Sequence, residues 1–303
     1  MPTRLRLLRF RPQEAALVAI TAVWGSTFLL VHWAMEHSGP WFFIGIRFLV
    51  AGLISVIIFR RSLRGMRWSD VGAGAAIGLM IHLGYGLQTV GLQTIESSTS
   101  GFITAMYVPL VPFAQWAVFR KRPPAMAFVG AGLAFLGLLL IAGPEAIVTL
   151  SLGAGEVATL IATLPIAAEI ILISVFAARG VDLGRVTVVQ LLTAGVLGIL
   201  TMPLAQESVP AFSWVWVGAA VGLGAASCVI QLTMNWAQKS VSPTRATIIY
   251  SAEPVWAGVV GRIAGERLPL TALIGGGLVV LGILASELRI VRRRAAPNDD
   301  RTS

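Results

Sequence analysis

The chain has 303 residues, of which 56% are hydrophobic and only 12% charged, and its mean hydropathy is +0.82. Soluble domains carry about 25% charged residues, so the composition excludes a soluble globule with one core and predicts a polytopic membrane protein. The formal net charge of +9 does not indicate nucleic-acid binding, because the cations cluster between apolar segments rather than along one face.

Ten apolar segments follow one another along the chain, and a helix needs about 20 residues to cross a bilayer. Because unpaired backbone groups are costly in lipid, each segment is expected to be a transmembrane helix. The connections are too short for a soluble domain. No small-residue cleavage site follows the basic N-terminus, so we interpret the first segment as an uncleaved span rather than a signal peptide. The expected bounds are 13–34, 41–59, 70–93, 98–119, 125–142, 155–177, 186–205, 213–237, 244–264 and 270–288.

Basic residues are distributed unevenly among the connections. If the N-terminus is cytoplasmic, 20 of the 23 lysines and arginines fall on the cytoplasmic side, Arg47 lies within a span, and only Arg262 and Arg267 fall outside. The positive-inside rule therefore predicts a multi-pass protein with both termini in the cytoplasm. Residues 1–12 are the predicted cytoplasmic basic N-terminus, and residues 289–303 are the predicted cytoplasmic basic tail.

The second half of the chain repeats the first. Gly74–Leu79 matches Gly218–Leu223 at a shift of 144 residues, Pro109 matches Pro254 at 145, and the shifts grow in order from 142. Chance likeness between apolar segments would not give an ordered drift. The two prolines lie inside spans, so we expect a matching pair of broken helices. Five spans per half is an odd number, which predicts an all-α fold of ten transmembrane helices as two inverted five-helix repeats, residues 13–144 and 150–288.

Two carboxylates lie near the middle of predicted spans. Glu253 precedes Pro254, and a proline frees a backbone carbonyl that can meet a ligand. Glu169 follows Pro165 and occupies, by the repeat, the position of Thr27. An ionisable group at this depth is costly unless paired, protonated or hydrated, so both acids are candidates to bind protons and a cationic substrate in alternation. The alternatives are a cap on loosened backbone for Glu253 and an interhelical hydrogen bond for Glu169.

Polar side chains recur at helical spacing on three further spans. His82 and Tyr85 lie on the third span, Tyr107 on the fourth, and Gln231 and Asn235 on the eighth. Polar stripes on helices in lipid are expected to face protein or water, so together they predict a hydrated cavity. Interhelical hydrogen bonding is the alternative for each residue.

Arg47 and Trp24 complete the candidate set. We expect Arg47, in the second span, to pair with another side chain or to extend towards the outer interface, with substrate contact as the alternative. Trp24 lies deeper than the interfacial tryptophans and is expected to line the cavity. The candidate substrate-binding or proton-coupling residues are Trp24, Ser26, Thr27, Arg47, His82, Tyr85, Tyr107, Glu169, Gln231, Asn235, Tyr250 and Glu253.

The order of several short motifs resembles that of the EamA-type drug/metabolite transporters. The motifs are Trp24–Phe28, Arg47–Phe48, Glu253–Val255 and Gly265–Leu268. The resemblance implies a multi-pass carrier of the bacterial inner membrane that exports amino acids or other small metabolites. It also implies a central cavity lined by spans 1, 3, 4, 6, 8 and 9. The chain departs from the family at Arg120-Lys121, because the Gly-Glu pair that precedes the last span is present only in the second half.

These observations predict a secondary active transporter that exports a small metabolite such as an amino acid by alternating access, coupled to protons. An uncoupled facilitator is the alternative. Two midplane acids suit zwitterionic or cationic substrates better than phosphates. No G-x-x-x-x-G-K run or catalytic motif occurs, so we expect neither ATP hydrolysis nor enzyme activity, and no cofactor or metal. The expected partners are the substrate, protons and the bilayer, not nucleic acid, with a homodimer possible through the glycine runs of spans 5 and 10.

Overall fold

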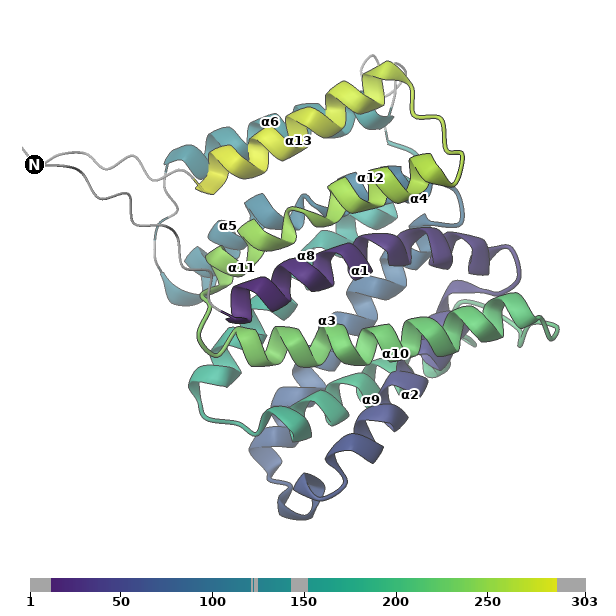
Figure 1. Ribbon diagram of the computed structural model, residues 1–303, viewed down its shortest axis with the longest axis vertical. Coiled ribbons are helices and arrows are strands. Elements are labelled where there is room, and N and C mark those ends of the chain that lie inside the picture. Colours follow the sequence, from purple (N-terminus) through teal and green to yellow (C-terminus); the bar gives the residue numbers. More distant parts are fainter. Residues whose placement is uncertain (1–11, 121, 123–124, 143–151, 288–303) are drawn as a thin grey trace, which may run out of the picture.

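The computed structural model describes residues 12–120, 122, 125–142 and 152–287, and these residues form helices and connections without a strand. Except for Pro12, the predicted basic N-terminus and the predicted C-terminal tail lie outside the described residues. Figure 1 shows the helices stacked side by side as rods. They are α1 (Pro12–Met35), α2 (Pro40–Phe59), the 3-10 turn η1 (Ser62–Gly65), α3 (Trp68–Gly91), α4 (Ser97–Thr104), α5 (Tyr107–Phe119), α6 (Ala125–Ala142), α8 (Ala154–Ala178), α9 (Leu183–Thr201), α10 (Trp214–Ala237), α11 (Pro243–Tyr250), α12 (Glu253–Ile263) and α13 (Leu270–Glu287).

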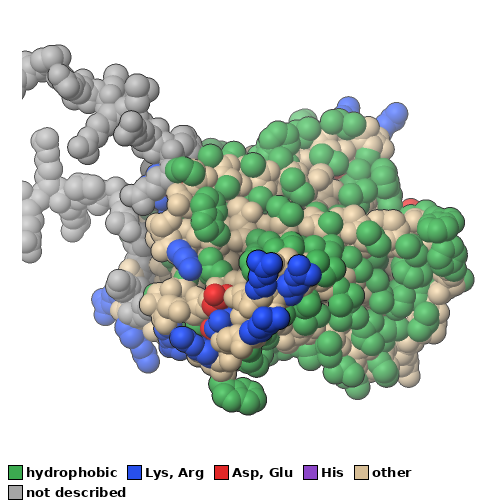
Figure 2. Space-filling model, turned by 60° about the horizontal axis from the view of Figure 1, so that its bottom comes forward, with side chains coloured by type: hydrophobic (Ala, Val, Ile, Leu, Met, Phe, Trp, Pro, Cys, Tyr) green, Lys and Arg blue, Asp and Glu red, His purple; other side chains and the backbone are tan. Residues whose placement is uncertain are grey.

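The helices account for the ten predicted spans. Seven segments of the described chain are long and apolar enough to cross a membrane, among them α4 and α5 taken as one segment. The apolar helices α6 and α13 are shorter, and α11 with α12 forms the remaining span. The space-filling view shows hydrophobic side chains over most of the flank and lysines and arginines gathered towards one end (Figure 2). The predicted all-α polytopic fold is confirmed.

The fourth and ninth spans are both broken near the middle. The fourth is interrupted between Thr104 and Tyr107, and the ninth between Tyr250 and Glu253. Each second segment carries its proline in the first turn, where the missing N–H has no acceptor within the helix in any case. The predicted pair of broken helices is therefore confirmed, and each break exposes the N-terminus of a half-helix inside the protein.

The main helix pairs keep their pattern when the halves are exchanged. α2 packs on α9 and α6 on α13, while α3 contacts α8 and α9 just as α10 contacts α1 and α2. The α6–α13 contact is formed by glycines, because a Cβ at Gly137 would lie 2.5 Å from the Gly275 carbonyl oxygen and one at Gly282 would lie 2.6 Å from that of Gly130. These glycine runs therefore pack against each other within the chain, and a homodimer through spans 5 and 10 would have to use their other faces.

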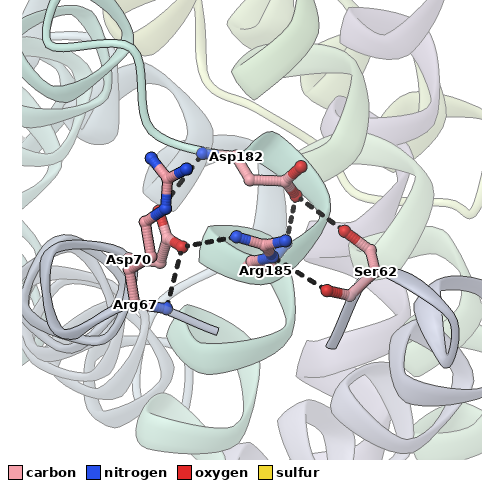
Figure 3. Close-up of polar contacts among 5 residues, drawn as sticks. All are labelled: Ser62, Arg67, Asp70, Asp182 and Arg185. Atoms are coloured by element: carbon pink, nitrogen blue, oxygen red, sulfur yellow. Dashed lines mark hydrogen bonds and ion pairs between the residues drawn. The ribbon is translucent and has the colours of Figure 1, made fainter. Parts of the chain in front are cut away.

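Acidic residues from each half also cap a helix of the other half. Glu207, after α9, accepts hydrogen bonds from the backbone N–H groups of Trp41 and Phe42 at 3.0 to 3.1 Å at the start of α2. Asp70, in the first turn of α3, accepts one from the N–H of Asp182 at 3.2 Å, at the start of α9. The contacts around Asp70 are drawn in Figure 3. Because helix N-termini leave backbone donors unpaired, each carboxylate fastens the two halves together at one end of the α2–α9 pair.

Candidate functional site

Glu253 is the first residue of α12 and is 1% exposed. Its Oε2 accepts a hydrogen bond from the hydroxyl of Tyr107 at 3.2 Å, and its Oε1 has no hydrogen-bond partner among the described residues. Tyr107 is the first residue of α5, so the hydrogen bond joins the two helix N-termini that the breaks create. The N-terminus of a helix carries a partial positive charge, which favours an anionic group beside it.

Glu169, in α8, is the second buried acid and is 0% exposed. Its Oε1 accepts a hydrogen bond from Gln231 Nε2 at 2.8 Å, while its Oε2 has no partner within the described part of the chain. Gln231 in turn accepts from Gln190 at 2.7 Å, and Gln190 accepts from Asn235 at 3.1 Å. A chain of buried amides thus holds one carboxylate oxygen in place and leaves the other available.

Buried aromatic rings contact one another beside the acids. Trp24 stacks on Tyr85 with ring centroids 6.3 Å apart and meets Tyr250 edge-on at 5.7 Å. Tyr85 lies within electrostatic range of both Glu169 and Glu253. The rings and the two acids therefore form one buried cluster, shielded from water in this conformation.

Arg47 belongs to the same cluster: of the two structural roles predicted for it, it pairs with another side chain and does not extend towards the interface. The side chain is 1% exposed, and its guanidinium carbon lies 5.4 Å from the ring centroids of both Phe48 and Tyr85. Its Nε donates to the hydroxyl of Ser227 at 2.9 Å, and its Nη2 has no partner among the described residues. The rings offer π faces that hold the cation without neutralising it. The cluster therefore contains one cation and two acids with unused hydrogen-bonding atoms.

Three predicted site residues lie apart from the cluster or bond elsewhere. The hydroxyls of Ser26 and Thr27 donate to carbonyls of their own helix, each at 2.7 Å. His82 bonds through Nε2 to the hydroxyl of Thr201 at 3.1 Å and lies 5.1 Å from the Trp41 ring. The structure thus brings together Trp24, Arg47, Tyr85, Tyr107, Glu169, Gln231, Asn235, Tyr250 and Glu253, but not Ser26, Thr27 or His82.

Two contributors were missed from the sequence. Ser227 precedes Gln231 by four residues, so the polar stripe of the eighth span continues one turn further back than predicted. Gly25 matters for its lack of a side chain, since a Cβ there would lie 2.6 Å from both the Glu253 carbonyl oxygen and the Trp256 Cβ. This close approach sets α1 against the start of α12 and places Trp24 beside the acids. The described residues contain no group of three or more His, Cys, Asp or Glu placed to hold a metal ion.

Glu266, in the connection from α12 to α13, fastens the start of α4. It accepts hydrogen bonds from the backbone N–H groups of Ser97 and Ser98 at 3.1 Å, and from both of their hydroxyls. Burial acts to raise the pKa of Glu266, but these hydrogen bonds outweigh it, so the pKa lies below its ordinary value. The carboxylate is therefore held ionised at the end of the broken helix remote from Glu253.

We expect Glu266→Gln to lower the melting temperature at neutral pH, because an amide cannot accept all four hydrogen bonds. The folded-state pKa is depressed, so the stability that Glu266 contributes is present above its unfolded pKa of about 4.3 and is lost as the pH falls through the folded value. Melting curves between pH 7 and pH 3 should show the gap between wild type and variant closing only below about pH 4.3. A constant gap across the range would contradict the assignment. The pKa of nearby Glu96 is raised by burial and by Glu266, so the comparison is repeated with Glu96→Gln in both proteins.

Comparison with known proteins shows which proteins this chain is similar to. A profile of the EamA-like transporter family matches residues 13–143 and 153–287. An Archaeoglobus fulgidus protein named as an uncharacterized transporter is 28% identical over 281 residues, which cover 91% of this chain and 86% of that protein. Escherichia coli K12 YedA, named as an uncharacterized inner membrane transporter, is 26% identical over 300 residues, with 91% and 92% coverage. A crystal structure of a protein 17% identical matches with a TM-score of 0.65 over 91% of this chain and 98% of that chain, which shows a shared fold.

Proposed function

This chain belongs to the EamA-like transporter family, and from that premise we propose that it exports a small zwitterionic or cationic metabolite, such as an amino acid, by alternating access coupled to protons. Membership of this family makes the chain a membrane transporter. The substrate class, the direction and the coupling are our inference from the buried cluster.

The observation that carries the proposal is the pair of half-satisfied carboxylates, Glu169 and Glu253, which share a buried cluster with Arg47. Within the described part of the chain, each acid has one unpaired oxygen and Arg47 has one unpaired nitrogen. Buried polar atoms without partners are unusual in proteins, and ionisable groups within a membrane mark substrate and proton pathways. An ammonium group would pair with the free carboxylate oxygens, while a substrate carboxylate would meet Arg47 and the half-helix N-termini.

The arrangement of the halves supports alternating access. The reciprocal caps of Asp70 and Glu207 and the exchangeable packing of the helices are expected from two inverted repeats, residues 13–144 and 150–288. In that architecture, rocking one repeat against the other opens a midplane site to either side in turn. The basic connections support cytoplasmic termini by the positive-inside rule, and the name of YedA supports the bacterial inner membrane as the location.

Transport in liposomes tests the proposal. A thermal-shift screen first selects amino acids that raise the melting temperature of the purified protein, since a ligand that binds only the folded state stabilises it. Efflux of a selected amino acid from loaded liposomes should then accelerate when the outside is made acidic, because inward proton movement drives outward substrate movement. Efflux that ignores the pH gradient while counterflow proceeds would instead establish an uncoupled facilitator.

A further inference from the structure

A hollow on the flank of the molecule separates α12 from α13. The groove has a volume of about 840 Å³, and α4 closes its back with Phe102. Its walls are apolar and exposed, among them Val259, Ile263 and Leu281 at 45%, 81% and 55%. In the bilayer such a surface faces acyl chains rather than water, so lipid is the medium available to fill it.

The groove extends along one half of the membrane. Its lining on α12 runs from Val255 to Ile263, which is about 12 Å at 1.5 Å per residue. One leaflet contributes about 15 Å of hydrocarbon, so the groove has the length of a single acyl chain. α12 begins at the buried Glu253, and its other end reaches the connection to α13. The groove therefore starts near the midplane and ends at the level of the headgroups.

The arginine side chain of Arg262 lies at the headgroup end of the groove. Arg262 lines the groove and is exposed, and within the described residues its side chain makes no ion pair or hydrogen bond. Arg267 is also exposed and precedes Leu268, another lining residue. The nearby acid, Glu266, is occupied by Ser97 and Ser98. A guanidinium with unused donors is suited to a phosphate, which it can bind in a bidentate manner.

Among the described residues of the first half, two positions equivalent to the groove carry bulkier side chains, and the position equivalent to Arg262 carries no cation. At the repeat shift of 145 residues, Phe113 stands where the groove has Gly258, and Phe128 stands where it has Leu273. The two rings meet edge to face with centroids 5.1 Å apart, and α5 packs against α6. Arg262 corresponds to the uncharged Ala117. One half of the duplicated fold thus fills this position with aromatic rings, while the other half keeps it open and adds a cation.

We propose that the groove between α12 and α13 is a binding site for one anionic phospholipid, with an acyl chain along Gly258 and Gly277 and the phosphate at Arg262. Under the proposed topology, the lipid lies in the outer leaflet. The bound chain fills the space between α13 and the half-helix that carries Glu253 and so braces that half-helix. The site is separate from the buried cluster, so its existence does not depend on the transported substrate.

Native mass spectrometry of the full-length protein, titrated with phosphatidylglycerol or phosphatidylcholine of equal chain length, tests the proposal. We expect one tightly bound phosphatidylglycerol in wild type, about tenfold weaker binding in Arg262→Gln, and loss of the lipid in Gly277→Leu. A Cβ at Gly277 meets nothing within 4 Å, so the leucine fills the groove without displacing backbone. Gly132→Leu is the matched control, because Gly132 is the repeat equivalent, is equally open, and does not line the groove. Leu273→Phe, which copies Phe128, is a second filling variant.

The outcomes separate the possible occupants. Retention of phosphatidylglycerol by both filling variants at the wild-type level would overturn the site. Equal binding of phosphatidylcholine in wild type would overturn the selectivity for an anionic lipid, and wild-type binding of phosphatidylglycerol in Arg262→Gln would overturn the role of Arg262. If the filling variants change the oligomeric mass instead of the lipid count, the groove is a contact between copies and the proposal fails. A rise in melting temperature with phosphatidylglycerol in wild type and Gly132→Leu, absent in Gly277→Leu, would support it independently.

Discussion

Glu253→Gln is expected to abolish substrate movement driven by a proton gradient, down to the rate of protein-free liposomes. Glutamine keeps the size of the side chain and can still accept the hydrogen bond from Tyr107, but it cannot take up or release a proton. The Glu253 position would then be uncharged at every pH, and Glu169 would remain as the acid that pairs with the substrate's ammonium group. Counterflow of substrate, which needs no net proton movement, should continue in the same liposomes, and its rate should no longer vary with pH.

Matched variants separate proton binding from structure. Tyr107→Phe removes the hydrogen bond but leaves the carboxylate, so gradient-driven transport should be slowed and not lost. Glu169→Gln tests whether the second acid carries the proton instead. A Glu253→Gln protein with the wild-type rate and the wild-type pH profile would remove Glu253 from the mechanism, and melting temperatures would show whether any variant fails through instability.

The sequence predicted the membrane spans and most of the cluster for a physical reason. Lipid cannot satisfy backbone or side-chain polarity, so apolar length marks each span and a polar residue within it stands out. Glu169, Glu253 and Tyr107 were found in this way. The breaks were predictable because Pro109 and Pro254 recur at the same place in both halves. Each of these signals lies within one helix or recurs at a fixed shift in the sequence. They can therefore be recognised without knowing how the helices pack.

Contacts between helices were harder to predict, because spacing gives the face of a helix but not its partner. Arg47 has a stem long enough to reach the interface, and only the positions of Phe48, Tyr85 and Ser227 show that it stays inside. His82 fitted the polar face of its span, yet its Nε2 bonds to Thr201 of α9 and its Nδ1 has no partner among the described residues. Ser26 and Thr27 had the right depth, but their hydroxyls bond to their own helix. Serine and threonine hydroxyls can generally hydrogen-bond to a carbonyl of their own helix. Their presence in a span is therefore a weak indication of a binding site.

Asp70→Asn is expected to destabilise the protein by about 3 kcal/mol, because it removes the ion-pair partner of a largely buried guanidinium. Asp70 Oδ2 lies 3.2 Å from Arg185 Nη1, and the two side chains are 2% and 17% exposed (Figure 3). The same carboxylate accepts from the N–H groups of Arg67 and Asp182. One substitution thus weakens the connection after α2, the start of α3 and the start of α9 together. The melting temperature should fall by about 5 to 10 °C.

A double-mutant cycle with Arg185→Gln measures the interaction directly. Once Asp70 is changed, loss of Arg185 should cost little more, because the two side chains act as a pair and their effects are not additive. Arg185 also donates to the carbonyl of Ser62 at 2.8 Å, which accounts for a small residual loss. Glu207→Gln, at the reciprocal cap, is the control: it removes a carboxylate that bonds only to backbone N–H groups among the described residues, so a smaller loss is expected. Additive losses in the cycle, or a larger effect of Glu207→Gln, would show that the Asp70–Arg185 pair does not hold the two halves together at this end.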